Sequence, residues 1–185
     1  MIVNAENIFL KRKDLVKEWR IEKYAYVMDT VQKTNVASDA NFQKTFNGFY
    51  RVRRGAEWRK VYYDFFERHK EEKNISFEEI VTYIFEKTGR IEASFSSKML
   101  ATFDSRFPIW DVYVMRNLGL ELKGKTKEER LQKAIYIYDE MKRWYETYLN
   151  TQEAKDQIAL FDRYLPEYVW LSDVKKIDFL LWSTR

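Results

Sequence analysis

The chain has 185 residues, of which 45% are hydrophobic and 17% aromatic, enough to bury a core and too apolar for a disordered chain. It contains no cysteine and one histidine, His69, which excludes disulfide frameworks, thiolate nucleophiles, sulfur-ligated metals and histidine-rich zinc sites. The net charge of +4, from 33 basic and 29 acidic residues, is compatible with nucleic acid but does not by itself indicate it.

The sequence predicts a soluble, cytoplasmic protein. No uninterrupted apolar run is longer than about five residues, as at 134–138, whereas a membrane span needs roughly 20. The first residues lack the apolar core and the small-residue cleavage site of a signal peptide. We therefore expect an intracellular protein without a membrane partner, and we expect no cofactor.

Hydrophobic spacing predicts helices along most of the chain. Apolar residues recur at intervals of three and four, and the 5 glycines and 2 prolines are too few for a protein of short strands and tight turns. After a short mixed segment at residues 1–10, helices with their caps are expected at 11–32, 41–46, 56–72, 76–89, around Lys98, and at 111–119, 126–150, 153–164 and from 172 onward.

Several helix ends carry their own signals. Ser76 and Thr126 each begin a sequence with the spacing of a capping box. Asp111 suits an N-cap, and Gly119 suits the first position after a helix. These signals make the boundaries of three helices more specific than hydrophobic spacing alone allows.

The predicted fold is all-α, with eight to ten helices in one compact body. Residues 49–54 alternate apolar residues with arginine and are either a short extended segment or a linker between helices. We expect a single helical domain over residues 1–185, either undivided or with two lobes that meet between residues 94 and 111.

The most specific pattern lies within residues 94–120. Residues 108–114 (PIWDVYV) and 117–120 (NLGL), preceded by 96–101 (SSKMLA), resemble the helix-hairpin-helix DNA glycosylase superfamily. That family has a Pro-Val-Asp-Thr-x-Val segment with a Leu-Gly pair after it, and its second hairpin helix lies upstream. Residues 90–95 (RIEASF) stand where the family has its glycine-rich hairpin.

The resemblance implies the fold of that family and base-excision chemistry on DNA. Asp111 would correspond to the catalytic aspartate, whose anion stabilises the cationic sugar that forms as the glycosidic bond breaks. Lys98 would correspond to the lysine that forms a Schiff base in bifunctional members. Considered without the resemblance, Asp111 is a helix cap worth about 1 kcal/mol, and Lys98 is a helix lysine that extends to water.

Two groups of residues are candidates for nucleic-acid contact. A basic run interleaved with aromatic residues could bind phosphates and stack on bases. It comprises Arg51, Arg53, Arg54, Arg59 and Lys60. The second group lies around the beginning of the Lys98 helix, where backbone N–H groups favour an anion, and comprises Arg90, Ser94, Ser96 and Ser97. Arginines also pair with acids, and serines also cap helices, so both groups keep a structural interpretation.

The sequence also bears on two other functions. A metal-dependent nuclease needs convergent carboxylates, and Glu92, Asp104 and Asp111 show no recognised nuclease spacing, so we expect no metal site. The alternative to DNA binding is a non-catalytic interaction protein, for example an inhibitor of a mobile element, which retains a glycosylase-like body and binds a protein partner through aromatic residues. The sequence leaves the oligomeric state open.

Overall fold

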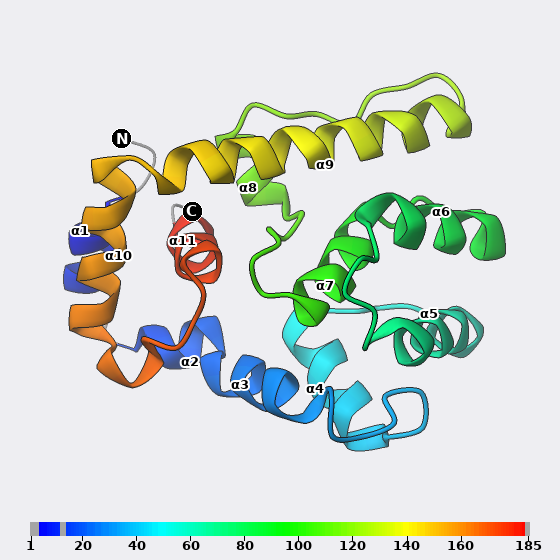
Figure 1. Cartoon of the computed structure of the whole chain (residues 1–185), viewed down its shortest axis with the longest axis horizontal. Helices are drawn as coiled ribbons and strands as arrows, with labels where there is room; N and C mark the ends of the chain where they lie inside the picture. The colour runs from blue at the N-terminus through cyan, green and yellow to red at the C-terminus, as the bar shows by residue number, and fades with distance from the viewer. Residues whose placement is uncertain (1–3, 12–13, 184–185) are drawn as a thin grey trace. The chain divides into compact units, whose positions relative to one another are not determined.

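The computed structural model describes residues 4–11 and 14–183, and the chain divides into two compact units. The central unit comprises residues 16–103. The flanking unit comprises the described residues on either side of it, 4–11, 14–15 and 104–183. Every regular element in these ranges is helical and none is a strand, which confirms the all-α prediction (Figure 1).

The central unit is filled by aromatic side chains. The ring of Phe46 lies 5.5 to 6.1 Å from those of Tyr62, Tyr63 and Phe66, and these four side chains have almost no exposed surface. They are therefore core residues and not a stacking surface for bases. The helices of this unit, the first of which begins one residue before it, are α2 (Leu15–Trp19), α3 (Ile21–Thr30), α4 (Ala40–Tyr50), α5 (Ala56–His69), α6 (Phe77–Thr88) and α7 (Ala93–Phe103).

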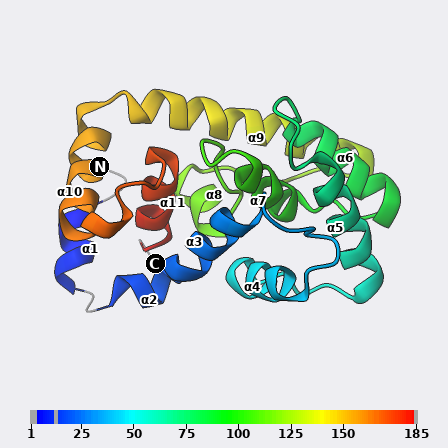
Figure 2. The same ribbon diagram turned by 60° about the horizontal axis from the view of Figure 1, so that its bottom comes forward.

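The flanking unit is built around its last helix, α11 (Asp173–Trp182), drawn in red in Figure 1, which packs against three other helices of the unit. Residues 174–181 of α11 are all buried. The first helix lies beside α10 in both views (Figures 1 and 2), and the ring of Phe9 stacks on Tyr164 at 4.6 Å. The other elements are α1 (Ala5–Lys11), α8 (Val112–Asn117), α9 (Lys127–Leu149), α10 (Gln152–Tyr164) and a 3-10 turn η1 (Pro166–Tyr168).

Several predicted helix positions were wrong. Residues 5–11, most of which belong to the segment expected to be mixed, form α1, and the described residues contain eleven α-helices where eight to ten were expected. The helix expected over 11–32 is divided, because Arg20 adopts a left-handed conformation (φ 55°) between α2 and α3; residues 12 and 13 lie outside the described residues. The helix expected to end near residue 47 continues through Gly48 to Tyr50. Phe42, Phe46 and Phe49 are buried along α4, and burial of this face outweighs the roughly 1 kcal/mol that a helical glycine costs.

The predicted caps are confirmed. The side chains of Ser76 and Thr126 each accept a hydrogen bond from the backbone N–H three residues on, and in both cases the backbone N–H of the cap residue donates to the side chain of the glutamate. Residues 51–55 form a linker between α4 and α5 and not a strand. In the central unit, this linker and the turn between α6 and α7 carry candidate residues, and in the flanking unit the segment before α8 carries Asp111.

Candidate functional site

Helices α6 and α7 form a packed pair joined by the short turn of residues 89–92. Gly89 ends α6 with φ 67°, a conformation that an L side chain adopts only with strain. Ile80 and Ile84 of α6 and Met99 and Leu100 of α7 are almost fully buried. The burial of these apolar faces fixes the turn and, with it, the beginning of the helix that carries Lys98.

The linker between α4 and α5 is tied to this turn by Arg54. Its Nε lies 2.7 Å from Oε1 of Glu92 and its Nη2 lies 2.9 Å from Oε2, so the pair is bidentate. The side chain of Glu92 is 8% exposed and that of Arg54 is 32% exposed. Hydrogen bonding to Glu92 raises the pKa of Arg54, and the guanidinium lies 5.1 Å from the ring centroid of Phe95. Arg54 is thus an anchor for the linker.

Lys98 lies beside the same linker. Its Nζ donates to Oγ of Ser94 at 2.9 Å and to the backbone oxygen of Tyr50 at 3.3 Å. The ammonium group also lies 5.2 Å from the ring centroid of Phe95, and the side chain is half-buried. Lys98 is therefore held in place by α4 and α7.

The remaining predicted contacts differ in accessibility. Ser96 and Ser97 have no exposed surface, and Ser97 donates to the backbone oxygen of Ser94 at 3.0 Å. Of the three serines, only Ser94 is therefore accessible enough to contact a phosphate. Lys60 pairs with Asp64 at 2.6 Å, and Arg59 is half-buried. The exposed cations of the set are Arg51, Arg53, Lys60 and Arg90.

Asp111 belongs to the flanking unit, whereas Lys98 belongs to the central unit. Asp111 immediately precedes α8, and its backbone oxygen accepts from Met115 N–H at 2.9 Å, as expected of an N-cap. At the other end, the N–H of Gly119 (φ 65°) donates to Arg116 and that of Leu120 to Met115, the Schellman arrangement. Both predicted ends of this helix are confirmed.

The segment before Asp111 is held by polar groups from α9 and α11. Tyr138 of α9 donates to the backbone oxygen of Pro108 at 2.9 Å. Asp178 of α11 accepts from the backbone N–H of Ile109 and from the hydroxyl of Tyr145. The segment is thus fixed at two successive residues by side chains from two helices.

A buried lysine completes this network. Nζ of Lys175 lies 3.9 Å from Oδ2 of Asp178, and both side chains are only 7% exposed. Burial raises the pKa of Asp178 to about 6, although Lys175 and Tyr145 act in the opposite direction. Burial lowers the pKa of Lys175, while Asp178 and Asp111 raise it. The carboxylate of Asp111 therefore lies close enough to act electrostatically on both residues.

Sequence reasoning did not select Lys175, Asp178 or Tyr145. Tyr145 lies on the apolar stripe of α9 and reads as a core residue. A signal for Asp178 was present, since Val174, Asp178 and Leu181 have the spacing of one helical face, and an acid on a buried face requires partners. Tyr145 and Ile109, the hydrogen-bond partners of Asp178, come from 30 or more residues away in the chain and have no local pattern.

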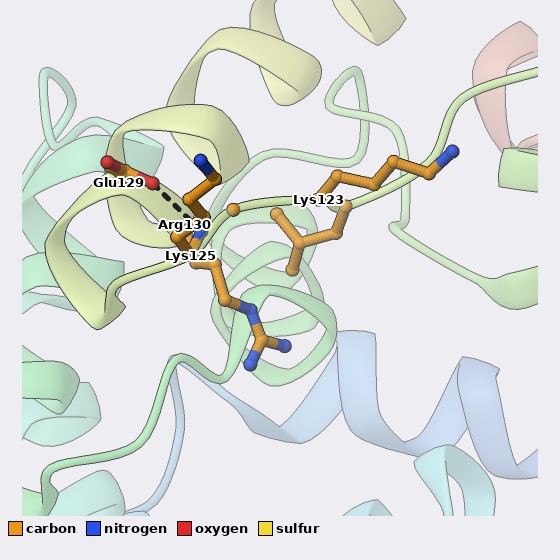
Figure 3. Close-up of a pocket in the computed structure, with 6 residues that line it drawn as sticks. Lys123, Lys125, Glu129 and Arg130 are labelled. Atoms are coloured by element: carbon orange, nitrogen blue, oxygen red, sulfur yellow. Dashed lines mark hydrogen bonds between the residues drawn. The ribbon is translucent and has the colours of Figure 1, made fainter.

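A shallow open hollow lies in the flanking unit at the beginning of α9 (Figure 3), lined by Leu122, Lys123, Gly124, Lys125, Glu129 and Arg130. Oε2 of Glu129 accepts from the backbone N–H of Lys125 at 2.8 Å, and Lys123 pairs with Glu121 at 2.9 Å. A Cβ at Gly124 would lie 2.6 Å from Cγ of Arg130, so glycine is needed for this close approach. The acids offset much of the positive charge here.

Comparisons with protein-family models, curated proteins and solved structures find no match to this chain. Among residues 4–11 and 14–183, no helix combines the length and the apolar character of a membrane span. Within the same ranges, no three His, Asp or Glu side chains are grouped so that they could hold a metal ion.

Proposed function

We propose that the protein binds DNA through the central unit and catalyses base excision with Lys98 and Asp111. The observation that carries this proposal is the contact between the basic linker and the α6–α7 turn. Arg54 bonds Glu92, and Lys98 bonds Tyr50. Two candidate groups that are about forty residues apart in sequence are thereby joined in one unit.

The exposed cations of this unit suit the DNA backbone. Arg51 and Arg53 project from a linker that Arg54 anchors, and Arg90 lies in the turn that the same anchor reaches. Arginine binds phosphate through paired N–H groups, and phosphate contacts supply most of the sequence-independent affinity for DNA. A helix–turn–helix pair with cations beside its turn agrees with the resemblance of residues 94–120 to helix-hairpin-helix glycosylases.

The proposed chemistry uses a lysine nucleophile and an aspartate anion. The amine of Lys98, once deprotonated, would attack the anomeric carbon of the sugar, and the base would leave with the electrons of the glycosidic bond. Asp111 would stabilise the positive charge that develops on the sugar. The bonds from Lys98 to Ser94 and Tyr50 support this role, because they fix the position of the amine.

The test uses the full chain and duplexes that each carry one damaged base. We expect base release and an adduct that borohydride traps, and we expect Lys98→Gln to abolish the adduct. Lys87→Gln is the matched control, because Lys87 is an exposed lysine of the neighbouring helix α6. Absence of both release and adduct across the panel would refute the chemistry, while DNA affinity measured in parallel would test binding separately.

One observation favours a second candidate, the non-catalytic interaction protein. Tyr164, Val169 and Trp170 of the flanking unit are 42%, 52% and 51% exposed, and large apolar side chains on a surface mark contact sites for proteins when they lie together. Binding to such a partner would change little between 50 and 200 mM salt. Binding to DNA should weaken steeply over the same range.

A further inference from the structure

The structure contains a buried polar network that the proposed chemistry does not use directly. We propose that Asp178 and Tyr145 are positioning residues for Asp111, which hold the segment before α8 so that the carboxylate of Asp111 stays in place for base release. This inference rests on the proposed function. It concerns the flanking unit alone.

The geometry supports a positioning role. Asp178 accepts from the N–H of Ile109, two residues before Asp111, and Tyr145 donates to the same carboxylate. Tyr138 holds Pro108 one residue further back. Ile109 and Trp110 are also buried, so the backbone that leads to Asp111 has little freedom. Loss of the Asp178 contact would release the end of this segment nearest to Asp111.

The charge of Asp178 matters because an ionised carboxylate accepts stronger hydrogen bonds than a protonated one. The titratable groups that face it are Tyr138 and Tyr145 from α9, Lys175 from α11, and Asp111 from the segment before α8. Asp162 of α10 pairs with Lys176 of α11 at 2.7 Å. Since the pKa of Asp178 is about 6, this carboxylate should gain or lose its proton within the pH range of an ordinary assay.

The first experiment measures single-turnover base release and DNA affinity from pH 5 to 8 in Tyr145→Phe and Asp178→Asn. We expect both variants to bind DNA as the unmodified protein does and to release base about 10-fold more slowly at pH 7.5, because small displacements of a catalytic group are costly. The rate of base release by the unmodified protein should fall as pH decreases through about 6, which gives its pH–rate profile an acid limb. Asp178→Asn should lack this limb. An unchanged limb in Asp178→Asn would overturn the proposal.

The matched controls lie on the same helices. Tyr148→Phe removes a hydroxyl of α9 that contacts Glu153 at 3.3 Å, and Asp173→Asn alters an exposed acid of α11. Both should keep the rate and the acid limb. Equal losses in the controls and the test variants would mean that the network is merely structural, which would also overturn the proposal.

A second measurement separates failure of this inference from failure of the proposed function. Hydrogen exchange of the Ile109 amide needs no substrate. We expect exchange about 10-fold faster in Tyr145→Phe than in Tyr148→Phe, while amides of α10 stay unchanged, because one partner of Asp178 is lost. If no base is released but this difference is present, the network holds the segment and only the chemistry is refuted. Equal exchange in the two variants would refute the positioning itself.

Discussion

The two units use charge in opposite ways. In the central unit, Arg51, Arg53 and Arg90 are exposed around a linker that one ion pair anchors. In the flanking unit, Lys175 and Asp178 are buried within the helix around which the unit is built. Exposed cations attract an anionic partner, whereas buried charges act on the chain itself. The central unit is therefore suited to recognition and the flanking unit to positioning.

The two ion pairs show the physical origin of this difference. Arg54 and Glu92 make two short hydrogen bonds of 2.7 and 2.9 Å, and hydrogen bonding raises the pKa of Arg54, so the guanidinium stays charged. Lys175 and Asp178 are 3.9 Å apart, too far for a hydrogen bond. Their attraction does not compensate for burial, and the pKa of Asp178 rises to about 6. The carboxylate of Asp178 can therefore change its charge near neutral pH.

The largest expected effect follows from Asp111→Asn. The amide keeps the capping geometry and loses the anion, so base release should fall by at least about 100-fold while DNA affinity and thermal stability stay the same. Asp111→Ala is the control, since it removes cap and charge together and should cost about 1 kcal/mol of stability. If Asp111 is only a cap, Asp111→Asn will change neither base release, nor DNA affinity, nor thermal stability, because asparagine caps about as well as aspartate.

The next effect concerns the pH dependence of stability. Because the pKa of Asp178 is raised in the folded state, the folded protein holds a proton that the unfolded chain has lost between about pH 4 and pH 6. The free energy of unfolding should therefore decrease as pH rises through this window, by about 3 kcal/mol for this group. Urea titrations at each pH should show this decrease in the difference between the unmodified protein and Asp178→Asn.

Comparison with Asp178→Asn isolates this contribution from other acids. Hydrogen bonds lower the pKa values of Asp39, Glu79 and Asp104, so their stabilisation is lost as pH falls and acts in the opposite direction. The contributions of these groups to the free energy of unfolding are the same in the unmodified protein and in Asp178→Asn, so they cancel when the two proteins are compared. A difference that is constant between pH 4 and pH 6 would mean that Asp178 titrates normally.

The third prediction tests recognition by the exposed cations. Reversal of Arg51 and Arg53 to glutamate should weaken DNA binding about 10-fold and reduce the salt slope by about 2. The fold should be kept, because both side chains are exposed. Arg54 is left intact because its replacement would leave Glu92 buried without its partner.

The matched control reverses Lys155 and Arg163, which are exposed cations of α10 in the flanking unit. This variant has the same net charge as the Arg51 and Arg53 variant. We expect its DNA affinity to change less than threefold at 150 mM salt. Equal weakening by both variants would assign the effect to net charge and remove the contrast between the units.

Local signals in the sequence were sufficient for much of the fold. The capping boxes at Ser76 and Thr126 and the left-handed Gly119 depend on neighbours within a few residues, and all were predicted correctly. The break at Arg20 was missed because a left-handed arginine has no sequence signature. The extension of α4 through Gly48 was missed because burial of its aromatic face depends on other helices.

The candidate site was less accessible to sequence reasoning. The arginine run and Lys98 were selected from composition and from resemblance, but the burial of Ser96 and Ser97 depends on the packing of α7 and could not be read from their position near its beginning. The bond between Arg54 and Glu92 joins residues 38 apart. Asp178, Tyr145 and Ile109 come together only when α9 and α11 pack with the segment before α8.

The smallest effect is expected when one glycine of each unit is replaced by alanine. Gly89 of the central unit and Gly119 of the flanking unit have φ 67° and φ 65°, so alanine should cost about 1 kcal/mol at either position. Hydrogen exchange should accelerate about fivefold in the unit that carries the substitution and less in the other, if each unit opens separately. Gly48→Ala is the control, because Gly48 lies inside α4, where alanine is favoured over glycine, and the nearest atom to its Cβ position is Lys23 Nζ at 3.7 Å. Uniform acceleration across both units would show that they unfold as one cooperative body, and the separate roles assigned to them would then need a basis other than independent stability.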